Sequence, residues 1–211
     1  MDSELPHLNP AEARVLGCLA EKKELTPDVY PMTLNGLQSA VNQKTARDPV
    51  MELDQGEVLR ALKLLQDKGL VRQVYGSRVE RYEHLLAQSF SLTQPQIALV
   101  GLLLLRGPQT AHELLARSER LARFGSMESL DTELDLLIGR RPPLIKLLER
   151  APGQREERYA HLLSGDVQTP VAVRAAPERA VSPGFESRLQ ALEEQVAALQ
   201  AKLDALGRAD R

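Results

Sequence analysis

The amino-acid sequence predicts a mainly α-helical fold with small β-hairpins, which is an α+β class. Three observations predict it. Residues 54–86 have the pattern of one amphipathic helix followed by one hairpin, and this pattern returns further along the chain. Residues 185–206 carry a heptad repeat of apolar residues. We therefore predict two tandem winged-helix domains followed by a C-terminal coiled-coil helix.

The composition limits the class of protein. With 211 residues, 43% of them hydrophobic, the chain can form one large core or two small ones. A net charge of −2 does not indicate a nucleic-acid binder by bulk electrostatics, so any basic surface must be local. One cysteine, no signal-peptide pattern and no apolar run near the roughly 18 residues of a membrane helix predict a cytoplasmic, soluble protein.

The first copy of the repeated pattern follows a lead-in of residues 1–8 and spans residues 9–90. Asn9 begins its first helix, followed by Pro at the first helical position, and Thr33 caps its second helix. Asp54 and Glu57 form a variant of the capping box at the third helix. Apolar residues repeat along that helix at Val58, Leu62 and Leu65. Three helices before a hairpin make up a winged helix.

Two short strands are expected after the third helix. Gly69 follows the helix where a residue that tolerates a positive φ is favoured. Residues 70–74 and 79–86 then read as strands around a turn at Tyr75-Gly76-Ser77.

The second copy spans residues 91–163. Leu8-Asn9-Pro10-Ala11-Glu12 corresponds to Leu92-Thr93-Gln94-Pro95-Gln96, 84 residues later. Beyond the first helix the shift is 77 residues, which pairs Thr33 with Thr110, Asp54 with Asp131, and the Arg-Tyr-x-His-Leu segments that start at Arg81 and Arg158. We read an internal duplication in which the third helix of the second copy begins at Asp131.

The last part of the chain changes in composition. Residues 164–184 are rich in Val, Ala, Pro and Ser and read as a linker, and residues 185–211 read as a helix with an apolar seam. The seam consists of Phe185, Leu189, Leu192, Val196, Leu199, Leu203 and Leu206. A solitary helix with such a seam is marginal in water, so we expect self-association through it. The alternative is that this helix folds back on its own domains.

Three segments resemble one bacterial family. Residues 42–51 (NQKTARDPVM), residues 8–17 (LNPAEARVLG) and the repeated Arg-Tyr-x-His-Leu are similar to the YceH family of uncharacterised proteins, over nearly the whole chain. The resemblance implies tandem winged helices and a short coiled coil. It implies no catalytic residues.

Duplex DNA is the predicted partner of the first copy. A helix-turn-helix protein places its recognition helix in the major groove, while cations nearby contact phosphates. The candidate contacts are Lys44, Arg47, Gln55, Arg60, Lys63, Arg72, Arg78 and Arg81. Asp54, Glu57 and Asp67 lie on the same helix, and the first 90 residues hold 11 cations against 13 anions. An ordinary solvated helix face therefore stays an open alternative.

The second copy is expected to contact protein instead. Asp131, Glu133 and Asp135 would open its third helix and repel phosphate, and the cations of its hairpin alternate with glutamates. Two functions follow as hypotheses: a DNA-binding protein, possibly a transcriptional regulator, or a protein-interaction scaffold built from tandem winged helices.

The sequence contains no recognisable catalytic or metal-binding motif. His84 and His161 occupy equivalent repeat positions, which favours a structural role beside the core. Cys18 lies in the first helix, where we expect a small buried residue, with Arg14 and Lys22 as ordinary surface residues. We therefore expect no enzyme, no metal and no cofactor.

Overall fold

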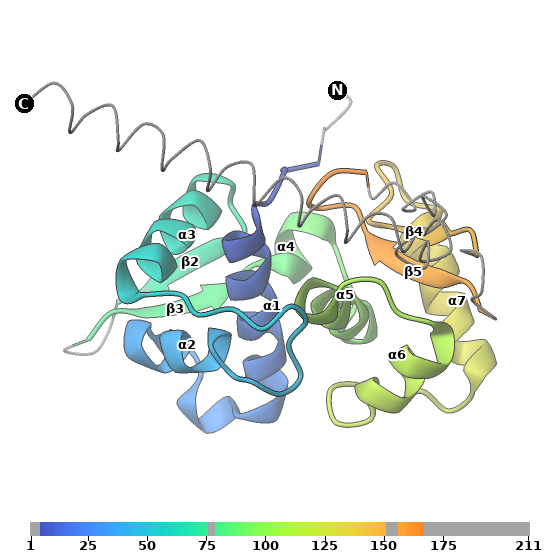
Figure 1. The fold of residues 1–211 in the computed structure, drawn as a ribbon, viewed down its shortest axis with the longest axis horizontal. Coiled ribbons are helices and arrows are strands. Elements are labelled where there is room, and N and C mark those ends of the chain that lie inside the picture. Colours follow the sequence, from blue (N-terminus) through green and yellow to red (C-terminus); the bar gives the residue numbers. More distant parts are fainter. Residues whose placement is uncertain (1–4, 76–78, 151–155, 167–211) are drawn as a thin grey trace, which may run out of the picture. The chain divides into compact units, whose positions relative to one another are not determined.

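The computed structural model describes residues 5–75, 79–150 and 156–166, and these belong to one compact unit. Its architecture is mixed α and β: helices pack around an aliphatic core, and two small antiparallel sheets lie on either side (Figure 1). Two successive groups of elements share the order helix, helix, helix, hairpin. We call residues 9–90 the N-terminal module and residues 91–163 the C-terminal module.

The N-terminal module follows the predicted order closely. Its elements are α1 (Pro10–Leu25), the 3-10 turn η1 (Pro27–Val29), β1 (Met32–Thr33), α2 (Leu34–Val41), α3 (Gln55–Asp67), β2 (Val71–Val74), β3 (Arg81–His84) and α4 (Leu86–Phe90). Asn9, Thr33 and Asp54 cap their helices as predicted, and Gly69 after α3 has a φ of +69°. The sequence pattern did not predict β1, which pairs with β3 to give a sheet of order β1-β3-β2, or the short helix α4.

The C-terminal module repeats the arrangement. Its elements are α5 (Gln94–Arg106), α6 (Ala111–Ser118), α7 (Met127–Ile138), β4 (Ile145–Leu148) and β5 (Arg158–His161). Thr93 and Thr110 cap α5 and α6 as predicted, each with a complete capping box. The bridge between Gln109 and Tyr159 takes the place of the pairing between Met32 and Tyr82 in the other sheet.

One predicted correspondence is wrong. The third helix of the second copy begins after the cap residue Ser126, not at Asp131, which lies inside α7. The residues between the second and third helices are 42–54 in the N-terminal module and only 119–126 in the C-terminal module. Because loops tolerate such length changes, a constant shift of 77 residues does not hold across this connection.

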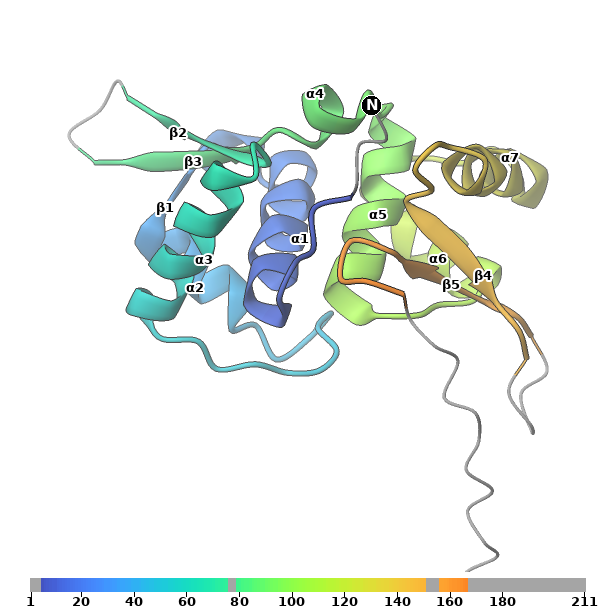
Figure 2. The ribbon, with the colours of Figure 1, turned by 90° about the horizontal axis from the view of Figure 1, so that it is seen from above.

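Helices α1 and α5 join the two modules (Figure 2). Both are buried on all sides over most of their length, which explains why α1 carries no simple one-sided apolar stripe. Their close approach uses glycines: a Cβ on Gly17 would lie 2.9 Å from Leu105 Cγ, and one on Gly101 would lie 3.3 Å from Ala20 Cβ. The described residues therefore share a single core.

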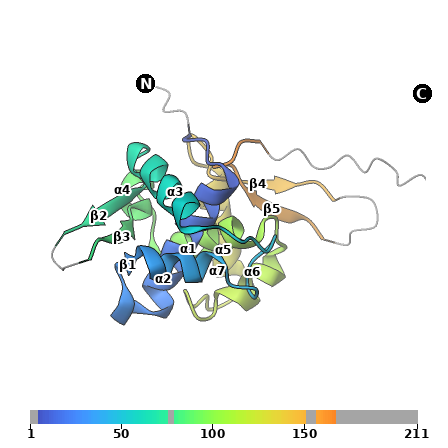
Figure 3. The ribbon, with the colours of Figure 1, turned by 60° about the vertical axis from the view of Figure 1, so that its left-hand side comes forward.

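The two hairpins extend from different sides of this helix pair (Figure 3). Residue Arg78, the linker beyond residue 166, and the predicted coiled-coil helix with its seven seam residues lie outside the described residues.

Candidate nucleic-acid interface

The outward face of α3 is where the sequence places a DNA-reading surface. Its capping box at Asp54 and Glu57 fixes the start of the helix, and Val58, Ala61, Leu62 and Leu65 face the core. The opposite side is open to solvent and includes Gly56, Arg60, Lys63, Leu64 and Asp67. Within the described residues, Arg60 and Lys63 have no hydrogen-bond or ion-pair partner, so two positive charges are free to meet a ligand.

Two further candidates, Gln55 and Lys44, are also exposed. Gln55 is exposed at the start of α3, and its amide donates to Asn35 Oδ1 on α2 at 2.6 Å. Lys44 is exposed on the connector between α2 and α3. Both remain accessible from solvent, as the sequence predicts.

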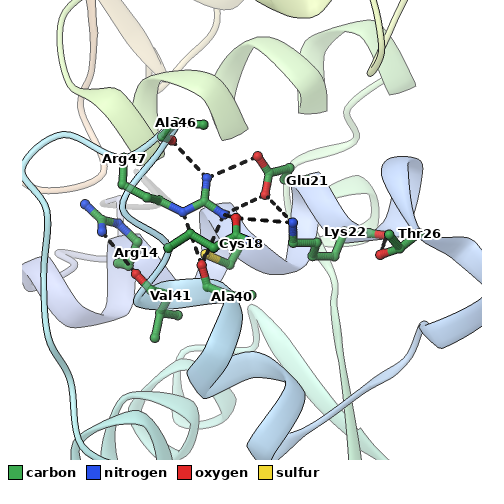
Figure 4. A network of polar contacts seen from close by, with 10 residues as sticks. Arg14, Cys18, Glu21, Lys22, Thr26, Ala40, Val41, Ala46 and Arg47 are labelled. Carbon is green, nitrogen blue, oxygen red and sulfur yellow. Dashed lines mark hydrogen bonds and ion pairs between the residues drawn. The ribbon is translucent and has the colours of Figure 1, made fainter.

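Arg47 requires a correction, because it is buried rather than placed beside a duplex (Figure 4). Its guanidinium donates to Glu21 through Nη1 at 3.1 Å and Nη2 at 2.6 Å, and to the Ala40 and Ala46 carbonyls. Burial alone would lower the pKa of Arg47, but the hydrogen bonds and charge of Glu21 raise it above its usual value. The side chain holds the connector onto α1 instead of reaching DNA.

Arg14 requires the same correction: it is only 2% exposed, not an ordinary surface residue. It donates to the Val41 carbonyl at 3.3 Å and to the Pro49 carbonyl at 2.5 Å. Together with Arg47, it places positive charge at the C-terminal end of α2, where helix carbonyls lack partners. Residues 42–51 thus help to hold the connector between α2 and α3 in place.

Cys18 belongs to the same network and is buried as predicted. Its thiol lies 3.5 Å from the Ala40 carbonyl, and burial raises its pKa to about 11. A thiol that stays protonated is a poor nucleophile, so this cysteine is structural.

The two described hairpin cations of the N-terminal module, Arg72 and Arg81, already have partners inside the protein. Arg72 pairs with Glu83 across the strands, with Nε 2.8 Å from the carboxylate. Arg81 donates to the Pro31 carbonyl at 2.8 Å, and the equivalent Arg158 donates to the Pro108 carbonyl at 2.9 Å. Arg81 therefore anchors the hairpin, and its charge is less accessible than that of Arg60 or Lys63.

His84 and His161 lie on the last strand of each module, as the repeat predicts. Burial lowers the pKa of each ring to about 4. His84 accepts a hydrogen bond from the Leu86 amide at 3.3 Å through Nδ1. The two rings are therefore neutral near pH 7 and pack as structural residues. The described residues contain no group of three His, Cys, Asp or Glu side chains suited to a metal ion.

Two leucines on the third helices, Leu64 on α3 and Leu136 on α7, are exposed, although no sequence pattern had marked them as candidates. Each lies beside a buried leucine but outside the apolar stripe of its helix. The helical periodicity of the sequence could therefore have identified both as exposed. In the described part of the chain, no helix combines the length and apolarity needed to cross a bilayer.

Comparison with known proteins places this chain in a family. Residues 8–154 match the model described as "Protein of unknown function, DUF480". The chain belongs to the DUF480 family.

Relatives in this family match over almost their full length. A UPF0502 protein of Mesorhizobium japonicum is 69% identical over 209 residues, covering 98% of this chain and 100% of the relative. A UPF0502 protein of Xanthomonas axonopodis pv. citri is 53% identical over 216 residues, covering 96% of each chain. DUF480 membership agrees with the resemblance to the YceH family found in the sequence.

Proposed function

We propose that both modules are winged helices and that the N-terminal one binds duplex DNA, with α3 in the major groove. The fold supports this proposal, because three helices precede an antiparallel hairpin in each module. The class of function that fits is transcriptional regulation in the cytoplasm, without catalysis. Self-association through Phe185 to Leu206, proposed from the heptads, would present two α3 helices to two half-sites.

The observation that carries the proposal is the difference between the outward faces of α3 and α7. On α3, Arg60 and Lys63 are exposed and unpaired among the described residues, and Gln55 is exposed at the start of the same helix. Helix α7 contains no Lys or Arg at all and four carboxylates. Arg and Gln side chains can bind base edges, and each cation next to a phosphate releases a counterion.

A charge-reversal experiment tests this proposal. Binding of a fluorescent, mixed-sequence duplex is measured by anisotropy over a range of salt concentrations, for the intact chain and for Arg60→Glu/Lys63→Glu. We expect the variant to bind at least about tenfold more weakly, which is about 1.4 kcal/mol. We also expect the slope of log affinity against log salt to fall by about two, as the loss of two phosphate contacts requires.

The matched control is Arg120→Glu/Arg123→Glu. These arginines lie in the connection between α6 and α7, are exposed, and have no partner among the described residues, so the change in net charge is identical. The control should keep its affinity within about threefold. Equal losses in the two variants, or no binding by the intact chain at low salt, would reject α3 as the DNA-binding surface.

A protein-interaction scaffold is the second candidate, and the acidic outward face of α7 favours it. Glu128 and Asp135 are exposed there together with Leu136, which is 54% exposed. Affinity capture from nuclease-treated bacterial lysate separates the two functions. A scaffold keeps its partners after nuclease treatment and loses them in an Asp135→Lys variant, whereas a DNA binder loses them on nuclease treatment alone.

A further inference from the structure

Helices α3 and α7 can be compared position by position. Their cap residues, Asp54 and Ser126, set a shift of 72 residues between the two helices. With this shift the buried positions coincide, because Val58, Leu62 and Leu65 correspond to Leu130, Leu134 and Leu137. The outward positions are therefore equivalent too.

An exposed leucine occupies the same outward position on each helix. Leu64 is 38% exposed on α3, and Leu136 is 54% exposed on α7. Covering a large apolar side chain with another surface removes it from water and lowers the free energy. On both helices this leucine is the only large apolar residue that is exposed, so each face has a small apolar centre.

The charges near the two leucines differ at equivalent positions. Lys63 on α3 corresponds to Asp135 on α7, and the exposed Gly56 corresponds to Glu128. Arg60 corresponds to Thr132, which is uncharged. The α3 face thus has Leu64 beside two free cations and one exposed carboxylate, Asp67, whereas the α7 face has Leu136 beside free carboxylates and no cation of the helix.

We propose that the outward face of α3 packs on the outward face of α7 of a second copy of this chain. Leu64 would lie against Leu136, with Lys63 and Arg60 facing Asp135 and Glu128. Because α3 and α7 are different surfaces, this contact is heterologous. This contact covers α3, so it excludes any other ligand of that face, and it exists independently of whether that ligand is DNA.

Disulfide trapping tests the contact directly. Leu64→Cys protein is mixed with Leu136→Cys protein in dilute oxidant, without DNA, and the dimer is followed on a non-reducing gel. The native Cys18 does not compete, because it is buried and its pKa is raised. We expect the mixture to form a cross-linked dimer at least about tenfold faster than either protein alone.

The matched control is Val29→Cys mixed with Leu136→Cys. Val29 is 55% exposed on η1, away from the outward face of α3. Association elsewhere in the chain would bring both pairs of cysteines together alike, so the comparison isolates the α3 to α7 contact. Cross-linking of positions 64 and 136 no faster than that of 29 and 136 would overturn the proposal.

A charge exchange provides the second test. Lys63→Asp is added to the Leu64→Cys protein, or Asp135→Lys to the Leu136→Cys protein, and each change alone should slow cross-linking at least about fivefold. Mixing the two changed proteins should restore the rate, because the pair is re-formed with opposite signs. Failure of this restoration overturns the assignment of Lys63 to Asp135. Since DNA is absent throughout, these results are independent of the DNA-binding test.

Discussion

The two modules share the residues that hold their backbones together and differ in the residues that face solvent. Arg81 and Arg158 each bind the carbonyl of a proline 50 residues earlier, and His84 and His161 end the equivalent strands. The outward faces of α3 and α7 differ in charge, because α3 carries both cations and carboxylates whereas α7 carries carboxylates alone. The repeated backbone arrangement is therefore kept in both modules, while the third helix presents a different surface in each.

The means of holding the connector also differs. In the N-terminal module, Arg14 and Arg47 cap α2 and bind the chain before α3. The shorter connection of the C-terminal module contains no buried arginine. We therefore expect the N-terminal module to depend on a buried ion pair for which the other module has no equivalent.

The largest predicted effect is that of Arg47→Met. The substitution leaves the Glu21 carboxylate buried without its partner, so we expect a loss of about 3–5 kcal/mol in the free energy of unfolding. Urea denaturation of the intact chain measures it. Arg72→Met is the control, since its pair with Glu83 is exposed and should be worth at most about 1 kcal/mol. Equal losses of unfolding free energy in the two variants would contradict the prediction that burial makes the Arg47–Glu21 pair more important than the exposed pair.

Acidification tests a property that both modules share. The pKa of His84 and His161 is about 4 in the folded protein and near 6.5 in an unfolded chain. Between these values the unfolded chain binds more protons, so stability falls as pH decreases from about 6.5 to 4, by up to about 3 kcal/mol for the well-buried His84. Urea midpoints at pH 7, 5.5 and 4.5 measure the effect. His84→Gln/His161→Gln should flatten it, and an unchanged slope would contradict this assignment.

Crowding between α1 and α5 tests the join between the modules. Gly17→Val would place new atoms against Leu104 and Leu105, so we expect a loss of about 2 kcal/mol, measured by thermal or urea unfolding. Gly101→Ala meets only Ala20 Cβ at 3.3 Å and should cost less, because alanine also favours the helix. A larger loss for Gly101→Ala than for Gly17→Val would contradict tight packing of α1 on α5 at Gly17.

The smallest predicted effect comes from changing the charge of the outward face of α7. Thr132→Arg/Asp135→Lys gives α7 the cations that α3 has at equivalent positions. We expect stability within about 0.5 kcal/mol of the intact chain, because both positions are exposed. If α3 binds DNA, the affinity for duplex DNA should rise about twofold to fivefold in the same anisotropy measurement. An unchanged affinity would show that charge on α7 is irrelevant to DNA binding, and a lower affinity would contradict the prediction.

Local sequence signals predicted most of the fold. The caps Asn9, Thr33, Thr93 and Thr110 are confirmed because a capping box is a local chemical pattern. The start of α7 was misplaced because Asp131 matched Asp54 in number but not in structure. Strand β1 was missed because two residues carry no alternation pattern and depend on pairing with β3.

The sequence alone predicts most of the helix starts, the helix residues that face a core, and the repeated order of the elements, since each rests on local patterns of residues. Only the tertiary structure decided which cations reach solvent. Arg47 meets Glu21 from 26 positions away, and Arg14 meets Pro49 from 35 positions away. Whether a charge is buried depends on such distant partners, and no local pattern specifies them.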